Sequence, residues 1–227
     1  MGKPEFFELL AFHLGPFSIG ATVLTTWLLM ALLSGVAWLG TRRLSVASPS
    51  RLQTALEGAL LALQSAIEDA APGHAARLLP FIGTLWLFIA TANLAGLAPG
   101  LRSPTGDLSL TVALAIVVFL AVHWFGIRID GLKAYLKHYL DPNPILLPFH
   151  LLGEITRTLA LAVRLFGNMM SLEMAALLVL LVAGFLAPIP LLMLHIIEAL
   201  VQAYIFGTLA LVYVAGALQS HELHHKD

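Results

Sequence analysis

The chain has 227 residues, of which 59% are hydrophobic and 11% are charged, and its mean hydropathy is +0.90. A soluble domain of this composition would lack the polar surface that keeps it dissolved, and a formal net charge of −1 leaves no basic face for nucleic acid. The absence of cysteine excludes disulfides, thiolate zinc sites and cysteine nucleophiles. The composition therefore indicates a protein that crosses a membrane several times.

Three apolar runs in the first part of the chain are long enough to cross a hydrocarbon core of about 30 Å. They are residues 17–40, 78–97 and 108–127. Between the first two, residues 51–71 repeat leucine and isoleucine at helical spacing among polar residues, which predicts an amphipathic helix lying at the membrane interface. We expect no signal peptide before them, because the N-terminus lacks a basic start and a small-residue cleavage site.

The last third of the chain consists of two unusually long apolar segments. Residues 146–186 would form a rod of roughly 60 Å, about twice the hydrocarbon thickness, so this helix must either break or lie strongly tilted. After Pro188 and Pro190 the chain returns over residues 191–219, and a polar tail follows at 220–227. The sequence predicts one all-α membrane domain with about five membrane helices and one interfacial helix. The last two membrane helices are expected to form a long, strongly tilted hairpin.

The basic residues are distributed unevenly between the two sides of this layout. Segments 41–77 and 128–143 and the tail share one side and carry eight of the twelve lysines and arginines, whereas the other side carries Lys3 and Arg102. By the positive-inside rule the C-terminus is cytoplasmic and the N-terminus lies outside. The remaining two, Arg157 and Arg164, fall inside the hairpin.

Ionisable and amide side chains are concentrated in the two hairpin helices. An ionisable group at the bilayer centre costs about 2.5–3.5 kcal/mol on insertion scales, so such groups are rare and usually functional. The alternative is a set of structural ion pairs that hold helices together, and this stays open for Glu154 with Arg157. The residues concerned are Glu154, Arg157, Arg164, Asn168, Glu173, His195, Glu198 and Gln202.

Helix geometry makes a structural ion pair a poor explanation for Arg164. Glu173, the nearest carboxylate in sequence, lies nine residues further on and points about 180° away on an ideal helix. Arg157 and Asn168 share the arginine's face but bring no negative charge. Arg164 is therefore expected to need a negative partner from outside its own helix.

The return helix carries a polar face of its own, formed by His195, Glu198 and Gln202 at positions i, i+3 and i+7. A lone histidine there would indicate a packed core residue. Followed by a carboxylate one turn on and an amide after another turn, it indicates a hydrated path that exchanges protons.

The tail carries a zinc-protease pattern that we interpret as a coincidence. Residues 221–225 read HELHH and match H-E-x-x-H. They follow the last span and offer no third ligand, whereas a catalytic zinc usually has three protein ligands. We expect no metal site and no intramembrane metalloprotease activity.

Several stretches resemble the a subunit of F-type ATP synthases, the stator half of a proton-driven motor. Residues 161–170 (LAVRLFGNMM) are similar to the family's RLFGN helix, and residues 195–206 (HIIEALVQAYIF) resemble its return helix. Residues 104–107 (PTGD) resemble the family's PTxD, and Asn93 fits the end of the preceding span. The chain departs from the pattern at Thr158, where the family often has proline, and at His150, where it commonly has glutamate.

The resemblance implies a non-catalytic, ion-translocating subunit without a cofactor, which couples translocation to rotation for ATP synthesis or hydrolysis. Its partners would be a ring of c subunits bearing carboxylates, the b-subunit peripheral stalk and membrane lipid, in the bacterial plasma (inner) membrane. Arg164 would act on the ring carboxylate between two offset half-channels. The outer half-channel would contain Glu173, His195, Glu198, Asn168 and Gln202, and weaker candidates for the inner one are His150, Glu154, Thr156 and Thr158.

One alternative from another class is a carboxylate-gated secondary transporter. It is disfavoured because the sequence contains no internal repeat and no pair of broken helices. The choice between H⁺ and Na⁺ stays open, since selectivity would depend mainly on the c subunit.

Overall fold

The computed structural model describes residues 12–14, 17–42, 44–45, 49–98, 103–131, 147–183 and 189–222. Its elements are β1 (Phe12–Leu14), β2 (Phe17–Ile19), α1 (Ala21–Thr41), α2 (Arg51–Ala70), α3 (Ala75–Ala95), η2 (Pro104–Gly106), α4 (Leu108–Asp130), α6 (Leu147–Ala183) and α7 (Ile189–Glu222). Five of these helices, α1, α3, α4, α6 and α7, are long and apolar enough to cross a membrane. The predicted class, an all-α polytopic membrane protein, is confirmed. The tail from residue 223 onward, with the end of the HELHH pattern, lies outside the described residues.

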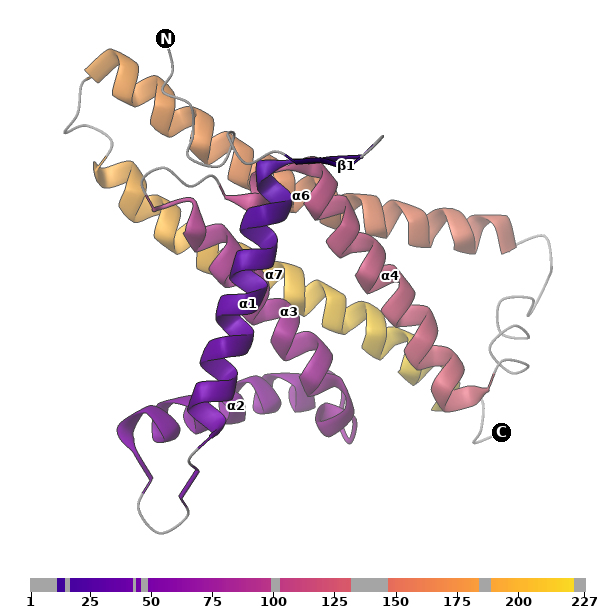
Figure 1. Ribbon diagram of the computed structural model, residues 1–227. Coiled ribbons are helices and arrows are strands. Elements are labelled where there is room, and N and C mark those ends of the chain that lie inside the picture. Colours follow the sequence, from indigo (N-terminus) through magenta and orange to yellow (C-terminus); the bar gives the residue numbers. More distant parts are fainter. Residues whose placement is uncertain are drawn as a thin grey trace.

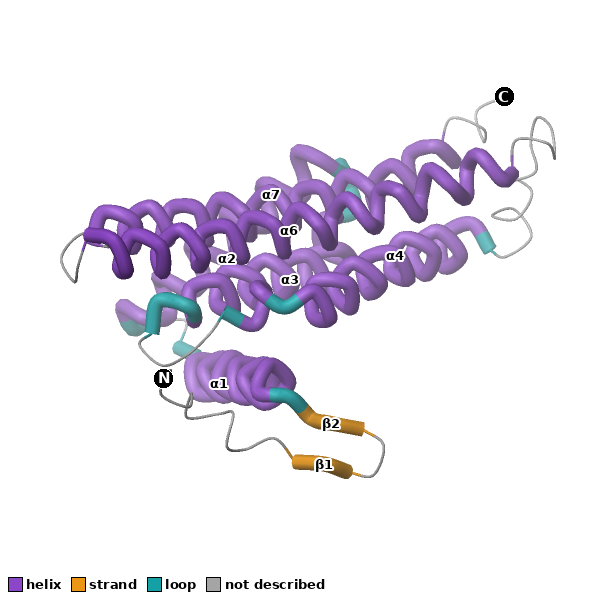
Figure 2. Tube along the Cα trace, turned by 90° about the horizontal axis from the view of Figure 1, so that it is seen from above, coloured by secondary structure: helices purple, strands orange, loops and turns teal. Residues whose placement is uncertain are grey.

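The helices form layers, with α3 and α4 between α1 and the α6–α7 hairpin (Figure 2). In the same view α1 is seen nearly end-on, whereas α6 and α7 extend lengthwise, so the hairpin runs obliquely to α1. Figure 1 shows α2 lying across the end of α1. Helix α6 is continuous over 37 residues, so the long segment is inclined and does not break.

Helix α2 is amphipathic and only partly covered by its neighbours. Ser50 caps it by accepting a hydrogen bond from the Gln53 amide at 3.2 Å. Ile67, near its C-terminal end, is completely buried against the rest of the protein, whereas Leu56 and Leu60 on the same apolar side are exposed. The exposed part of this face suits the membrane interface that the sequence predicts for this helix.

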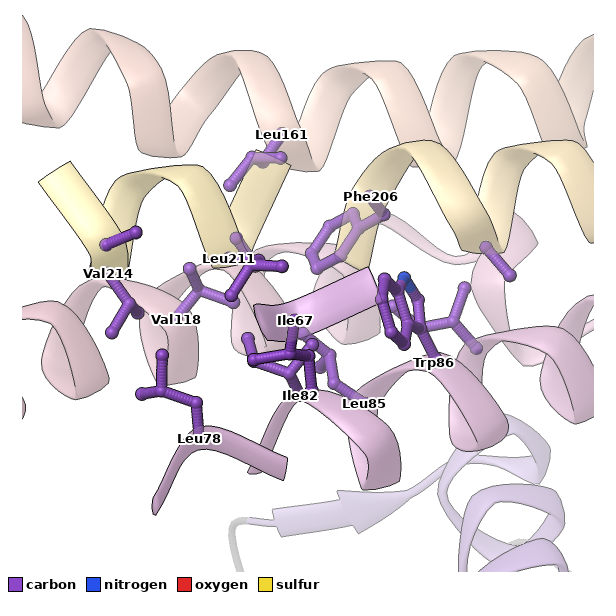
Figure 3. Packing of buried hydrophobic residues seen from close by; sticks show 14 of the residues in the cluster. Ile67, Leu78, Ile82, Leu85, Trp86, Val118, Leu161, Phe206, Leu211 and Val214 are labelled. Carbon is purple, nitrogen blue, oxygen red and sulfur yellow. The ribbon is translucent and has the colours of Figure 1, made fainter. Parts of the chain in front are cut away.

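The buried core joins α2, α3, α4, α6 and α7 in one cluster (Figure 3). Trp86 of α3 stacks on Tyr204 of α7 with ring centroids 6.0 Å apart, and its indole N–H donates to the Tyr204 carbonyl at 3.2 Å. A Cβ atom on Gly207 would overlap the Trp86 indole. Small residues permit close helix contacts in membranes, and Gly207 has this role where α3 meets α7.

A polar contact ties the largely exposed helix α1 to the start of α4. The Thr22 hydroxyl donates to Asp107 Oδ2 at 2.9 Å, and Asp107 caps α4 by accepting from the Ser109 amide at 2.9 Å. Partial burial raises the pKa of Asp107, but the hydrogen bonds from the Ser109 amide, the Ser109 hydroxyl and the Thr22 hydroxyl outweigh it and lower this pKa below its usual value. Asp107 is therefore a charged cap that also anchors α1.

Candidate functional site

Arg164 lies near the middle of α6 on its exposed face. Its side chain is exposed, while the neighbouring Leu161 and Leu165, about 60° and 100° around an ideal helix from it, are buried in the core. Within the described part of the chain, Arg164 forms no ion pair or hydrogen bond. The guanidinium is thus presented outward from a long apolar helix.

Several of the residues around Arg164 on this face are small. Ala160 and Ser171 are exposed and Gly167 is half-buried, and all three fall within about 60° of Arg164 on an ideal helix. A Cβ atom on Gly167 would meet nothing within 4 Å. Small side chains let a neighbouring helix approach closely, so the surface around the arginine suits contact with a helical partner.

Two contacts fix how α6 and α7 are aligned. Asn168 Nδ2 donates to Gln202 Oε1 at 2.6 Å, and the Arg157 guanidinium lies 5.7 Å from the centre of the Tyr213 ring. Both contacts define the same antiparallel register. This register places Glu173 at the level of the segment that begins at His195, so the predicted outer residues lie in one half of the hairpin, from Asn168 and Gln202 near its middle to Glu173 and His195.

Glu173 faces the segment between α3 and α4 instead of Arg164. Its Oε1 accepts from the Ser103 amide at 3.3 Å, and the Ser103 hydroxyl lies 2.6 Å from that of Thr105. Thr105 donates to Asn93 Oδ1 at 2.6 Å, and Asn93 Nδ2 donates to the Ala199 carbonyl at 3.0 Å. A continuous buried polar chain therefore links the α6 carboxylate to the backbone of α7.

The polar residues of α7 are enclosed beside this chain. His195 is 5% exposed and Gln202 is fully buried, whereas Glu198 is half-buried. The Nε2 atoms of His195 and Gln202 have no hydrogen-bond partner within the described residues. Buried polar atoms are nearly always paired with protein or water, so these two atoms are suited to a hydrated path.

At the other end of α6, Glu154 meets a residue that was not predicted from the sequence. Its Oε2 lies 3.2 Å from Nε2 of His123 on α4. The hydroxyls of Thr156 and Thr158 donate to carbonyls of their own helix, and the His150 side chain is exposed. Among the described residues, Glu154 is the candidate for the inner path that contacts a titratable side chain of another helix.

Together these features define a class of protein: a polytopic integral membrane protein with an exposed arginine on a long, continuous helix and buried or half-buried polar side chains on either side of it along that helix. The family model of the ATP synthase A chain matches residues 23–215. The chain belongs to this family.

Curated relatives match nearly the full length of the chain. It is 65% identical over 211 residues to ATP synthase subunit a 2 of Pelobacter propionicus, covering 93% of this chain and 92% of that protein. It is 66% identical over 207 residues to ATP synthase subunit a 1 of Hahella chejuensis, covering 91% and 88%. It is 56% identical over 223 residues to ATP synthase subunit a of Legionella pneumophila strain Paris, covering 98% and 97%.

Proposed function

We propose that the chain is the ion-translocating stator subunit of an F-type ATP synthase, against which a ring of c subunits rotates. The subunit performs no covalent chemistry itself and couples translocation to ATP synthesis or hydrolysis elsewhere in the complex. The observation that carries this proposal is Arg164, an exposed cation on an apolar helix that forms no ion pair within the described part of the chain and has small side chains beside it. Membership of the ATP synthase A chain family supports it.

The arginine acts on a carboxylate that each c subunit carries through lipid. Desolvation raises the pKa of such a group, so it travels protonated. Near Arg164, at about 4 Å and an effective dielectric constant near 20, the attraction is about 4 kcal/mol, or roughly three pKa units. This is enough to ionise the carboxyl group at neutral pH. Because a guanidinium does not release its proton, Arg164 also blocks direct passage between the two sides.

Protons reach and leave the ring through two offset half-channels. Arg164 stands nine residues before Glu173 and ten after Glu154, roughly 14 and 15 Å along the helix axis. Each proton that crosses 100 mV releases about 2.3 kcal/mol, which the offset converts into rotation. The outer half-channel comprises Glu173, His195, Glu198, Asn168 and Gln202, and candidates for the inner one are His150, Glu154, Thr156 and Thr158.

The orientation follows from the basic residues. The end of the bundle that contains α2 and the C-terminal end of α4 carries Arg51, Arg77 and Arg128, which supports a cytoplasmic location for it. The polar chain around Glu173 then opens to the outside. The membrane is a bacterial plasma (inner) membrane, and the b-subunit peripheral stalk holds the subunit against rotation.

The test compares Arg164→Ala and Arg164→Lys in complete complexes reconstituted into liposomes. ATP-driven proton pumping and passive proton uptake are measured. Alanine removes the cation, so coupled pumping should be abolished and a passive leak should appear. A lysine lacks the planar guanidinium group and can exchange protons when buried. Arg164→Lys should therefore pump almost as poorly as Arg164→Ala.

The control is Arg51→Lys, an exposed arginine on α2, which should pump as the wild type does. Normal coupled pumping by Arg164→Lys at wild-type yield of the complex would overturn the proposed mechanism. A purely structural arginine would give that result, because lysine would largely restore its role.

A further inference from the structure

His123 and Glu154 form a titratable pair between α4 and α6. His123 Nε2 lies 3.2 Å from Glu154 Oε2, and the two side chains are 27% and 20% exposed. Glu154 lies on the same side of α6 as Leu161, two turns further on, which is buried in the core. The carboxylate therefore points into the bundle, away from the exposed face of Arg164.

The second ring nitrogen of His123 determines where protons can reside. Its Nδ1 lies 2.8 Å from the Phe119 carbonyl, and a carbonyl oxygen only accepts hydrogen bonds, so Nδ1 carries a proton. In the neutral ring Nε2 then carries a lone pair and no proton. The carboxylate oxygen that it faces, when ionised, also carries no proton. The short contact is attractive only if one of the two groups carries a proton, on either Nε2 or the carboxylate.

The pair lies at the end of the bundle opposite to Glu173. His123 stands five residues before Arg128, the last residue of the apolar span. Glu154 precedes Arg164 and Glu173 follows it on the same helix. Arg164 thus has a proton-holding side chain on each side, one facing α4 and the other facing the segment around Ser103.

We infer that His123 and Glu154 together form the proton-exchanging station of the cytoplasmic half-channel, with His123 of α4 supplying the imidazole that faces the α6 carboxylate. This role rests on the proposed function, since it requires that Arg164 divide two proton paths. In each transfer the shared proton leaves toward one side, and a neutral imidazole and a carboxylate remain. A proton from the other side then restores the pair, so one proton enters for each that leaves.

Among the described residues, the charged and titratable groups near the pair are two arginines and His150. On α4, the Arg128 guanidinium lies 5.1 Å from the Trp124 ring centre. On α6, Arg157 lies over the ring of Tyr213, which α7 contributes, and the exposed His150 lies one turn before Glu154. The two arginines do not exchange protons, so they set the local potential without offering a competing relay.

The test uses the complete complex in inverted membrane vesicles, whose cytoplasmic face is turned outward. Proton transport is measured while the external pH is varied from 5 to 8 at fixed internal pH, and then with the roles exchanged. In Glu154→Gln the amide can donate to His123 Nε2, so the contact and the packing persist but no proton is exchanged. Transport should fall by about tenfold or more. The transport rate should no longer depend on the external pH, whereas its dependence on the internal pH should persist.

His123→Gln should behave in the same way, and exchanging the two residues, His123→Glu with Glu154→His, should restore the external pH dependence. Matched controls are His74→Gln and Glu57→Gln, which change residues on the same side of the bundle but far from this contact, and these should transport as the wild type does. The inference is overturned if Glu154→Gln keeps the wild-type rate and pH dependence, since the pair would then only hold α4 to α6. If Glu154→Gln lowers the yield of the complex, the exchanged variant decides, because assembly without restored external pH dependence also overturns the inference.

Arg164→Ala in the same vesicles separates this inference from the proposed function. If Arg164→Ala pumps normally, the proposed function fails whatever the pair does. If Arg164→Ala is inactive while Glu154→Gln resembles the wild type, only the role of His123 and Glu154 is lost.

Discussion

The contact between Gly207 and Trp86 shows how one hydrogen atom in place of a side chain determines the approach of two helices. A Cβ atom at Gly207 would overlap the indole, which is held in place by its hydrogen bond to the Tyr204 carbonyl. Gly207→Ala should therefore push α3 from α7 and destabilise the protein by about 1–3 kcal/mol, the usual cost of overpacking.

Thermal unfolding of the purified protein in detergent measures this effect. The matched control is Gly216→Ala on the same helix, where a Cβ atom would meet nothing within 4 Å. Gly216→Ala should leave the melting temperature unchanged or raise it slightly, because alanine is the better helix former. Equal stability of the two variants would contradict the assigned role of Gly207.

The candidate site was predictable where it depends on one helix and not where it depends on two. Nine residues turn a helix by about 180°, so the sequence already separates Glu173 from Arg164, and the structure places Glu173 against the Ser103 amide. His123 could not be found in this way. Its partner Glu154 is on another helix, and the apolar run that contains His123 carries no polar pattern to show which side faces α6.

At the scale of elements, the attachment of α1 to α4 depends on a charge. The pKa of Asp107 is lowered in the folded protein, so its ionised form adds stability above the unfolded pKa, near 3.8, and this contribution is lost as the pH falls through the folded pKa. Asp107→Asn keeps an acceptor for the Ser109 amide but removes the charge at the start of α4. At neutral pH it should lower stability by about 0.3–1 kcal/mol.

The measurement is thermal unfolding in detergent at pH 7 and at pH 3. The difference between the wild type and Asp107→Asn should shrink at the lower pH, where the aspartate becomes protonated. Asp69→Asn, an exposed change on α2, should show no such dependence. A difference that is the same at both pH values would show that the Asp107 charge does not stabilise the fold.

The elements themselves were largely predictable because each membrane helix requires a long apolar run. Five such runs gave five membrane helices. The sequence did not decide whether the segment 146–186 breaks or tilts, since no residue in it forces either outcome. Packing against α4 and α7 supports the continuous helix Leu147–Ala183. Pairing of Phe17–Ile19 with β1 was also not evident, because an apolar run reveals neither a strand nor its partner.

For the whole molecule, the absence of cysteine offers a direct test of orientation. Gly20→Cys introduces an exposed thiol before α1, and Ser65→Cys introduces one on α2. With the N-terminus outside, a membrane-impermeant maleimide should label position 20 in intact cells and position 65 only in inverted vesicles. The opposite labelling pattern would reverse the assignment of the outer and cytoplasmic ends, and with it the assignment of the two polar paths.

The inclination of α6 places its two carboxylates at different lateral positions as well as at different depths. Glu154 and Glu173 are separated by nineteen residues, roughly 28 Å along the helix axis. If α6 stood upright, a rotor passing its exposed face would reach the levels of both carboxylates at the same angular position. Because α6 is oblique to α1, the two carboxylates are displaced sideways as well as in depth, so under the proposed function a passing rotor would reach one before the other. A mirror-image slope would reverse that order, so in the proposed mechanism the sense of rotation for a given direction of proton flow depends on the direction in which this one helix is inclined.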